Sequence, residues 1–204
     1  MKIGILGAGN VGGSLGKLWA ATGHDVLFGT RDPQSEKVQK LLAETGGKAG
    51  AGSIAEAASF GEVVVLSIGW PAAGAALETA GNLTGKIIID TTNRFAPSGK
   101  STGSAGEGVA RLAPGAQVVK AFNTLGTNRY AAPRFGSQTA SMFICGDNPA
   151  AKTTVATLTE ELGFEVVDCG PLSNTGLLEA MGQLWVYLAR SGMGRNHAFK
   201  LLRD

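Results

Sequence analysis

The sequence is poor in net charge and in long apolar runs, and each shortage excludes a class of protein. Its 204 residues carry a formal net charge of only +2, whereas nucleic-acid-binding domains have strongly basic surfaces. The longest apolar runs fall far short of the roughly 20 residues that cross a bilayer. No signal-peptide pattern opens the chain. We therefore expect a cytoplasmic protein that has no nucleic-acid partner and no membrane span.

Cysteine is also scarce, because Cys145 and Cys169 are the only two in the chain. Neither stands in a CxxC pair or at a metal-ligand spacing from histidine, so the sequence predicts neither a zinc site nor a disulfide framework. Free cysteine behaves as a small apolar residue, and we expect both thiols to be buried. No Ser/His/Asp set and no pair of catalytic carboxylates is recognisable, so we assign no catalytic side chain and no metal ligand.

Aromatic residues make up only 6% of the chain, whereas glycine, at 31 residues, is about twice as frequent as usual. Apolar runs typical of buried parallel strands alternate with segments of helical period. The expected strands are Lys2–Leu6, Asp25–Phe28, Val63–Ser67, Lys86–Asp90, Gln117–Ala121, Ala140–Cys145 and Phe164–Asp168. The expected helices are Val11–Thr22, Ser35–Thr45, Ser53–Ser59, Ala72–Ala80, Gly106–Leu112, Ala150–Leu162, Thr175–Ser191 and Arg195–Leu202. The segment Ala96–Gly108, rich in Gly, Ser and Thr, predicts a loop.

The segment from Gly7 to Gly12 has the pattern G-x-G-x-x-G and stands between the first expected strand and the first expected helix. Gly7 permits a tight turn, Gly9 lets the backbone approach a diphosphate, and Gly12 allows the helix to pack closely on the sheet. Backbone N–H groups at the helix N-terminus, including those of Asn10 and Val11, favour an anion. The pattern predicts a dinucleotide-binding α/β fold of the Rossmann type, with a doubly wound, mostly parallel sheet.

The second expected strand leads into Gly29-Thr30-Arg31, about 20 residues after the glycine pattern, where an NAD enzyme would place an Asp or Glu. A carboxylate there would repel a 2′-phosphate, whereas Thr30 can donate a hydrogen bond and Arg31 can pair with phosphate and stack on adenine. Asp32 follows one position later, and a shift of register would make it the acid of an NAD site. The residue types favour NADP(H) as the cofactor.

Further candidate site residues follow three more strands, at the edge of the sheet where ligands bind in open α/β folds. They are Ser67, Ile68, Gly69 and Trp70 after the third expected strand, Asn93 after the fourth and Asn123 after the fifth. We expect these residues to shape the nicotinamide and acceptor side of the site. Trp70 has two interpretations, either a hydrophobic cover over the sheet edge or a wall of the cofactor or acceptor pocket.

With these residues in place, the chain resembles the NADP oxidoreductases dependent on the deazaflavin coenzyme F420, a Rossmann family that includes the reductase domains of eukaryotic metalloreductases. The resemblance covers nearly the whole chain and rests on Gly7–Gly12, Gly29–Arg31, Ser67–Pro71, Ile144–Asp147, Gly170–Asn174 and Gly192–Gly194. It implies an NADP-binding Rossmann domain over residues 1–169 and a short C-terminal helical extension, residues 170–204, packed on it. It also implies NADPH along the strand ends and an acceptor ring stacked against the nicotinamide.

Together these features predict an NADPH-binding oxidoreductase that transfers hydride between NADPH and a small ring acceptor such as a deazaflavin or a flavin. Deazaflavin-using relatives differ at Phe122-Asn123-Thr124, so a quinone or another small electrophile also stays open as acceptor. Hydride transfer between two bound rings depends mainly on orientation, which agrees with the lack of recognisable acid–base residues. The alternative is a non-catalytic module that senses NADP(H). An NAD-dependent dehydrogenase of hydroxy or imino acids is disfavoured, because too few residues remain for a substrate domain.

The expected helix Thr175–Ser191 carries one apolar face. This face consists of Leu177, Leu178, Met181, Leu184, Trp185 and Leu188 at helical spacing. It either packs on the sheet or forms the interface of a homodimer. We expect packing within the subunit, and a homodimer is the alternative, since a neighbour would add a wall to a pocket with little substrate domain.

Overall fold

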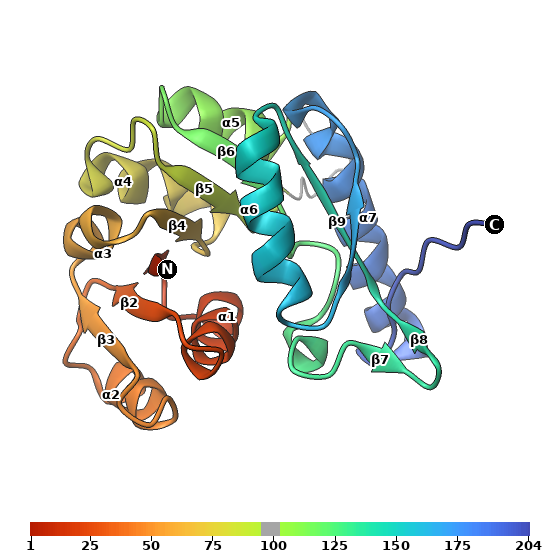
Figure 1. The fold of residues 1–204 in the computed structure, drawn as a ribbon, viewed down its shortest axis with the longest axis horizontal. Helices are drawn as coiled ribbons and strands as arrows, with labels where there is room; N and C mark the ends of the chain where they lie inside the picture. Colours follow the sequence, from red (N-terminus) through yellow and green to blue (C-terminus); the bar gives the residue numbers. More distant parts are fainter. Residues whose placement is uncertain (95–102) are drawn as a thin grey trace.

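One eight-stranded sheet runs through the structure, a computed structural model that describes residues 1–94 and 103–204 (Figure 1). The strands are β1 (Lys2–Leu6), β2 (Asp25–Gly29), β3 (Ala49–Gly52), β4 (Val63–Leu66), β5 (Ile87–Asp90), β6 (Gln117–Lys120), β9 (Ser141–Gly146) and β10 (Glu165–Asp168). They lie in the order β10-β9-β6-β5-β4-β1-β2-β3. The strands from β6 to β3 in this order are parallel, β9 is antiparallel to β6, and β10 is parallel to β9. A separate hairpin consists of β7 (Arg134–Phe135) and β8 (Gln138–Thr139).

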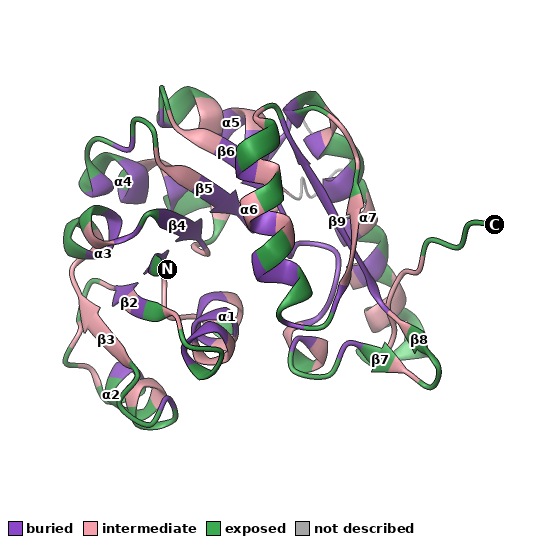
Figure 2. Ribbon diagram, viewed as in Figure 1, coloured by how far each residue is buried: buried purple, intermediate pink, exposed green. Residues whose placement is uncertain are grey.

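Helices cover both faces of the sheet, as a doubly wound α/β fold requires. They are α1 (Asn10–Ala21), α2 (Glu36–Ala43), α3 (Ile54–Phe60), α4 (Trp70–Ala80), α5 (Ala105–Leu112), α6 (Pro149–Glu160) and α7 (Thr175–Leu188). Successive strand residues point to opposite faces, so Val65 packs in the cluster under α1 and α6, whereas Leu66 packs under α3, α4 and α5. Figure 2 shows that the central strands are largely buried. Among the described residues, no helix has the length and apolarity of a membrane span.

The mostly parallel, doubly wound sheet is confirmed, and most expected elements are present with ends that differ by a few residues. The strand β3 lies outside the expectations, because its sequence Ala-Gly-Ala-Gly lacks the β-branched and aromatic side chains that mark a strand. Of the expected loop Ala96–Gly108, positions 96–102 lie outside the described residues, and α5 already begins at Ala105. The helix expected at Thr175–Ser191 is α7, which ends at Leu188 and is followed by a kinked turn over Ala189–Met193.

The helix expected at Arg195–Leu202 is wrong, because these residues follow a non-helical path beside β9. Ser141 donates its backbone N–H to the carbonyl oxygen of Phe199 over 3.0 Å, and Leu201 donates its N–H to Ser141 Oγ over 3.1 Å. Ala198 and Phe199 are consecutive, yet their side chains pack into different apolar clusters. An extended chain, whose successive side chains point to opposite sides, satisfies both clusters at once.

The two thiols lie in and beside the last two strands. Cys145 is in β9, and Cys169 directly follows β10, at the next position of the register that pairs Asp168 with Ile144. Cys145 is buried as expected, whereas Cys169 keeps part of its surface exposed. Burial raises the pKa of the Cys145 thiol to about 12 and also raises the pKa of the Cys169 thiol. Both groups are therefore protonated, weak nucleophiles at neutral pH.

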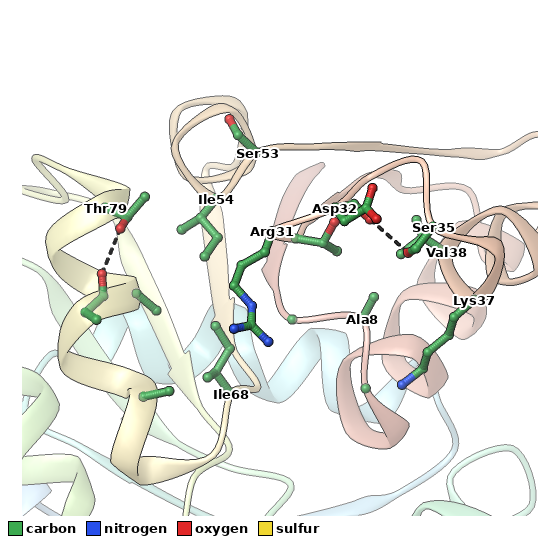
Figure 3. Close-up of a pocket in the computed structure, with 16 residues that line it drawn as sticks. Ala8, Arg31, Asp32, Ser35, Lys37, Val38, Ser53, Ile54, Ile68 and Thr79 are labelled. Carbon is green, nitrogen blue, oxygen red and sulfur yellow. Dashed lines mark hydrogen bonds between the residues drawn. The ribbon is translucent and has the colours of Figure 1, made fainter.

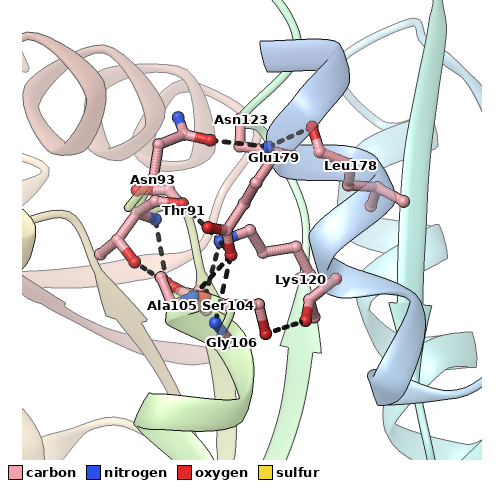
Figure 4. Close-up of polar contacts among 12 residues, drawn as sticks. Thr91, Asn93, Ser104, Ala105, Gly106, Lys120, Asn123, Leu178 and Glu179 are labelled. Atoms are coloured by element: carbon pink, nitrogen blue, oxygen red, sulfur yellow. Dashed lines mark hydrogen bonds and ion pairs between the residues drawn. The ribbon is translucent and has the colours of Figure 1, made fainter. Parts of the chain in front are cut away.

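A buried ionic cluster around Lys120 holds α7 to the strand ends (Figure 4). Lys120 Nζ lies 2.9 Å from Asp90 Oδ2 and 3.1 Å from Glu179 Oε1, and it donates a hydrogen bond to the carbonyl oxygen of Thr92. Lys120 and Asp90 have no exposed surface, and Glu179 is only 7% exposed. Glu179 Oε1 also accepts the N–H of Ala105 over 2.8 Å, at the N-terminus of α5, where the helix dipole favours a carboxylate. The cluster thus joins β5, β6, α5 and α7.

Replacing Lys120 by Met should lower the free energy of unfolding by about 3–5 kcal/mol, because the buried carboxylates of Asp90 and Glu179 lose their cation. Urea unfolding followed by circular dichroism measures the change. Lys17→Met is the matched control, since Lys17 pairs with Glu44 on the surface and exposed pairs contribute only about 0–1 kcal/mol. Equal unfolding midpoints for the two variants would mean that the cluster does not stabilise the fold.

Candidate functional site

A cavity of about 650 Å³ opens at the carboxyl ends of β1 and β2 (Figure 3). The glycine turn Gly7–Gly9 and the segment Thr30–Asp32 each contribute a wall directly after a strand. The remaining walls come from the starts of α2 and α3 and from one side of α4. Their lining residues are Ser35, Lys37, Val38, Ser53, Ile54, Ile68, Ala72, Ala75, Ala76 and Thr79. The cavity therefore lies at the edge of the sheet where the sequence predicts a dinucleotide.

The glycine turn is shaped by contacts that only glycine permits. Gly7 has φ +108°, a left-handed conformation that side chains disfavour. A Cβ at Gly12 would lie 2.1 Å from the carbonyl oxygen of Gly7, so the first turn of α1 packs directly on the end of β1. A Cβ at Gly9 would meet nothing within 4 Å, because Gly9 faces the open cavity. The backbone at Gly9 is thus accessible to a ligand group.

The N-terminus of α1 adds an electrostatic preference to this turn. Gly9 occupies the N-cap position, and Asn10, Val11 and Gly12 form the first turn. Within the described part of the chain, no side chain caps this end and no acidic residue lies in its first turn. Backbone N–H groups without an intrahelical acceptor and the positive end of the helix dipole then face the cavity, an arrangement that favours a phosphate.

Two basic side chains line the cavity on the β2 side, Arg31 after the end of β2 and Lys37 in the first turn of α2. In Figure 3 they reach into the cavity from different sides. Thr30 Oγ1 is buried and has no hydrogen-bond partner among the residues that the structure describes. A buried hydroxyl without a partner is costly, which indicates a polar ligand group beside it. A hydroxyl and two cations suit the phosphate that distinguishes NADP(H) from NAD(H).

Sequence reasoning misses Lys37 and Ser35, which line the same cavity. The glycine turn and the end of β2 are recognised by a fixed spacing along the chain, but no spacing rule reaches into α2. The available signal is topological. Because α2 follows β2, its first turn starts at the same edge of the sheet as the end of that strand.

Asp32, the acid of the alternative NAD interpretation, supports the turn that leads into α2. Its Oδ1 accepts the backbone N–H of Gln34 over 3.1 Å, and its carbonyl oxygen accepts the hydroxyl of Ser35 over 2.9 Å. Asp32 also borders the cavity, with its side chain exposed to solvent. These contacts give Asp32 a structural role in the loop that does not depend on a ribose.

The segment after β4 braces the glycine turn. Ser67 Oγ lies 3.0 Å from the carbonyl oxygens of both Leu6 and Gly7, so its hydroxyl is engaged behind the turn. Ile68 lines the cavity with its side chain, and Gly69 occupies the N-cap position of α4. Of these residues, Ile68 is therefore the one whose side chain reaches the ligand side.

Trp70 begins α4 and packs its ring on α5. A Cβ at Gly108 of α5 would lie 2.3 Å from Trp70 Cη2, so the indole and that helix are in close contact. The guanidinium carbon of Arg94 lies 5.6 Å from the centroid of the Trp70 ring. The indole thus joins α4 to α5 and to the segment after β5. This packing favours the interpretation of Trp70 as a hydrophobic cover.

Asn93 and Asn123 follow the neighbouring strands β5 and β6, and their side chains touch (Figure 4). Asn123 Nδ2 donates one hydrogen bond to Asn93 Oδ1 and another to the carbonyl oxygen of Leu178 in α7, each over 2.9 Å. Asn123 is only 8% exposed, whereas Asn93 is half-buried. The pair lies at the same edge of the sheet as the cavity, but farther along it, beyond β4.

Comparison with known proteins agrees with this geometry. The profile of the family described as NADP oxidoreductase coenzyme F420-dependent matches residues 2–94. The crystal structure of a candidate F420-dependent NADP-reductase from Arthrobacter sp. FB24 is 33% identical and has a TM-score of 0.90, with 100% of each chain covered. The chain belongs to the coenzyme F420-dependent NADP oxidoreductase family. This family is one of NADP oxidoreductases.

Two further relatives of this chain are longer than it. Metalloreductase STEAP3 of Rattus norvegicus is 32% identical over 186 residues, which cover 88% of this chain and 36% of the relative. The chain thus spans about a third of the length of the curated relatives it matches. A reductive aminase from Aspergillus terreus, solved with NADPH, is 19% identical, has a TM-score of 0.70, and covers 94% of this chain with 62% of its own. At that identity the likeness shows the fold alone.

Gly9→Ala should leave the stability of the fold unchanged and weaken NADPH about tenfold or more, since its methyl group would fill space that a diphosphate needs. Gly12→Ala should instead lower the free energy of unfolding by about 1–3 kcal/mol, because its methyl would clash with the Gly7 carbonyl. Thermal unfolding and NADPH titration separate the two effects. Gly13→Ala is the control, because its Cβ would meet Leu41 at an ordinary 3.4 Å. Similar stability losses in the Gly9 and Gly12 variants would contradict this account of the turn.

Proposed function

We propose that this chain transfers hydride between NADPH and a ring acceptor of the deazaflavin or flavin class. One observation carries the proposal: the cavity, the N-terminus of α1 and the Asn93–Asn123 pair all lie at one edge of the sheet. The strands there follow the order β6-β5-β4-β1-β2. Neighbouring strands are about 4.8 Å apart, so this edge extends over roughly 19 Å. An extended dinucleotide with its adenosine at β2 would bring its ring to β4 and β5.

The adenosine end of this arrangement accounts for the choice of NADPH. Thr30 would donate its unpartnered hydroxyl to the 2′-phosphate, and Arg31 and Lys37 would neutralise its charge. Charge-assisted hydrogen bonds to phosphate are about twice as strong as neutral ones. NADH has a hydroxyl in that place and would gain little from either cation. We therefore assign the discrimination between the two cofactors to these three residues.

The diphosphate would lie on the glycine turn. Gly7 shapes the turn, Gly9 leaves the backbone open to the diphosphate, and the N–H groups of Asn10, Val11 and Gly12 would donate hydrogen bonds. When bound, NADPH supplies the hydride from its nicotinamide ring. The task of the protein residues at the ring end is to orient two planar rings and to exclude water. Such a task requires no acid or base on the protein.

The acceptor would lie beside the nicotinamide ring, near the ends of β4, β5 and β6 and close to α5 and α7. The family description supports a deazaflavin as the acceptor. A flavin is the alternative, because deazaflavin-using relatives differ from this chain at Phe122-Asn123-Thr124. Both are planar rings that accept a hydride and can stack on nicotinamide. The partner in this proposal is thus a small molecule, and the proposal involves neither nucleic acid nor membrane.

Titration of the purified protein with NADPH and NADH, followed by addition of coenzyme F420, FMN or FAD, tests the proposal. We expect tighter binding of NADPH and a loss of reduced-nicotinamide absorbance that depends on the acceptor. Arg31→Ala should weaken NADPH by roughly 10- to 100-fold, the effect of losing a charge-assisted hydrogen bond, and should leave NADH unchanged.

Lys40→Ala is the control, because Lys40 is exposed on the same helix as Lys37 but does not line the cavity. Equal losses for NADPH and NADH in Arg31→Ala would refute the assignment of the 2′-phosphate site. Tight binding of NADPH without turnover of any of these acceptors would contradict the enzyme and favour a non-catalytic module that senses NADP(H).

We also propose that the chain forms a homodimer through the outer face of α7. Leu177, Leu184 and Tyr187 are 65%, 48% and 66% exposed, and their spacing places them on one side of the helix. The opposite side, with Leu178 and Trp185, is buried within the subunit. The seven-residue step from Leu177 to Leu184 suits helix-to-helix packing, and a two-fold axis would bring identical faces together.

Leu184→Asp should convert the dimer to a monomer, because it introduces a charge into the centre of the proposed interface. Analytical ultracentrifugation measures the mass of each species. Thr153→Asp is the control, since Thr153 is also exposed but belongs to α6 and not to α7. A monomeric wild type, or a dimer that Leu184→Asp leaves intact, would contradict this interface.

A further inference from the structure

The side-chain amide of Asn123 has a fixed orientation, and it imposes one on Asn93. Asn123 Nδ2 lies 2.9 Å from the carbonyl oxygen of Leu178, which can only accept a hydrogen bond. The nitrogen of Asn123 must therefore face Leu178, because a flipped amide would set two oxygens against each other. The same nitrogen donates to Asn93 Oδ1 over 2.9 Å. Asn93 accordingly turns its oxygen toward Asn123 and its nitrogen away, as Figure 4 shows.

Helix α7 approaches the two amides closely because it has a glycine at the contact. A Cβ at Gly182 would lie 2.7 Å from the backbone oxygen of Asn123 and 3.0 Å from Asn93 Oδ1. Any larger residue there would push α7 away from the strand ends. Gly176, one and a half turns earlier on α7, is exposed, and a Cβ there would meet nothing within 4 Å. The two glycines of this helix therefore differ in what they permit.

The backbone before Asn123 is held in a conformation that is uncommon for its residue type. Phe122 has φ 58°. Among the residues that the structure describes, no other residue except glycine has a positive φ. Its carbonyl oxygen accepts the hydroxyl of Tyr130 over 2.6 Å, and its ring packs edge-on against Trp19 and Phe164. Burial raises the pKa of Tyr130, so its hydroxyl stays protonated and continues to donate. Strain of this kind persists where the surroundings enforce it, often at functional sites.

The backbone after Asn93 is fixed as well. Arg94 donates its N–H to Glu179 Oε2 over 3.1 Å, and the other oxygen of the same carboxylate belongs to the buried cluster with Lys120. Leu178, Glu179 and Gly182 thus contact Asn123, Arg94 and Asn93 from within little more than one turn of α7. Within residues 1–94 and 103–204, no hydrogen bond is recorded for Asn93 Nδ2. The arrangement therefore leaves the two N–H groups of Asn93 Nδ2 pointing away from Asn123, where they can donate to a ligand.

We propose that Asn123 is a positioning residue that holds Asn93 Nδ2 as a donor to the carboxamide oxygen of the nicotinamide. The inference rests on the proposed function and adds to it the group that orients the ring. Asn93 follows β5, two strands from β1 in the sheet, and so lies about 10 Å from the glycine turn along the edge. Asn123 is only 8% exposed and contacts Asn93, so we assign its effect on the ligand to Asn93. A ring held by its carboxamide presents one face to the acceptor.

A double-mutant cycle tests the proposal by binding alone. Asn93→Ala and Asn123→Ala should each weaken NADPH by about 2- to 10-fold, the effect of one neutral hydrogen bond. The double variant should bind no more weakly than Asn93→Ala, because Asn123 acts only through Asn93. Adenosine 2′,5′-bisphosphate, which lacks the nicotinamide, should bind equally to all four proteins. Calorimetric titration provides both sets of affinities.

Losses that multiply in the double variant would overturn the proposal, as would an unchanged NADPH affinity in Asn123→Ala. An equal loss for adenosine 2′,5′-bisphosphate would reduce Asn123 to a structural role. Failure of the wild type to bind NADPH more tightly than the bisphosphate would instead refute the proposed function at the ring end. If Asn123→Ala does not fold, Gly182→Ala tests the same arrangement, and Gly176→Ala is its control. Only Gly182→Ala should lose affinity for NADPH. Equal affinities of these two variants would overturn the proposal.

Discussion

The ends of β5 and β6, beside which we propose that the acceptor binds, depend on the neutralisation of buried charge at Lys120. Its ammonium lies between the carboxylates of Asp90 and Glu179, and without it both would be buried anions that lack a cation. Glu179 also fixes the backbone around it, because its oxygens accept the backbone N–H groups of Arg94 and Ala105. The position of α7, and of the residues that α7 touches at the ends of β5 and β6, therefore follows from electrostatics as well as from apolar packing.

The two ends of the site differ in how far sequence reasoning reaches. The residues that we propose for the diphosphate and the 2′-phosphate belong to consecutive strand, turn and helix units, so local spacing predicts Gly7, Gly12 and Arg31. At the ring end, Asn123 meets Asn93 and Leu178 across separations of 30 and 55 residues. No local rule connects positions that far apart. The sequence predicts that Asn93 and Asn123 follow strands, and the three-dimensional structure adds that one amide holds the other.

The elements that the sequence did not reveal have physical reasons of their own. The strand β3 has side chains too small to produce an apolar pattern, and its conformation comes from pairing with β2. The tail at Arg195–Leu202 contains spacing that suits a helix, but Phe199 packs against the cluster of Phe143, Cys145 and Leu178 while Ala198 packs against the main core, which requires an extended chain. Sequence spacing does not predict Lys37 as a cavity residue, because its place in the cavity depends on where the first turn of α2 lies in space. In each case tertiary contacts outweigh local preference.

The ladder between β6 and β9 contains only two residue pairs, Val119 with Gly146 and Lys120 with Cys145. The sheet therefore has a seam at this point, with few backbone hydrogen bonds across it, and the apolar core under α6 is the principal bridge between β6 and β9. The parallel register of the six strands from β3 to β6 therefore does not extend to β9 and β10. Substitutions beyond it need not disturb the register of the first six strands. A change in the packing of β9 and β10 can therefore leave unchanged the strand ends at which we propose that the nucleotide binds.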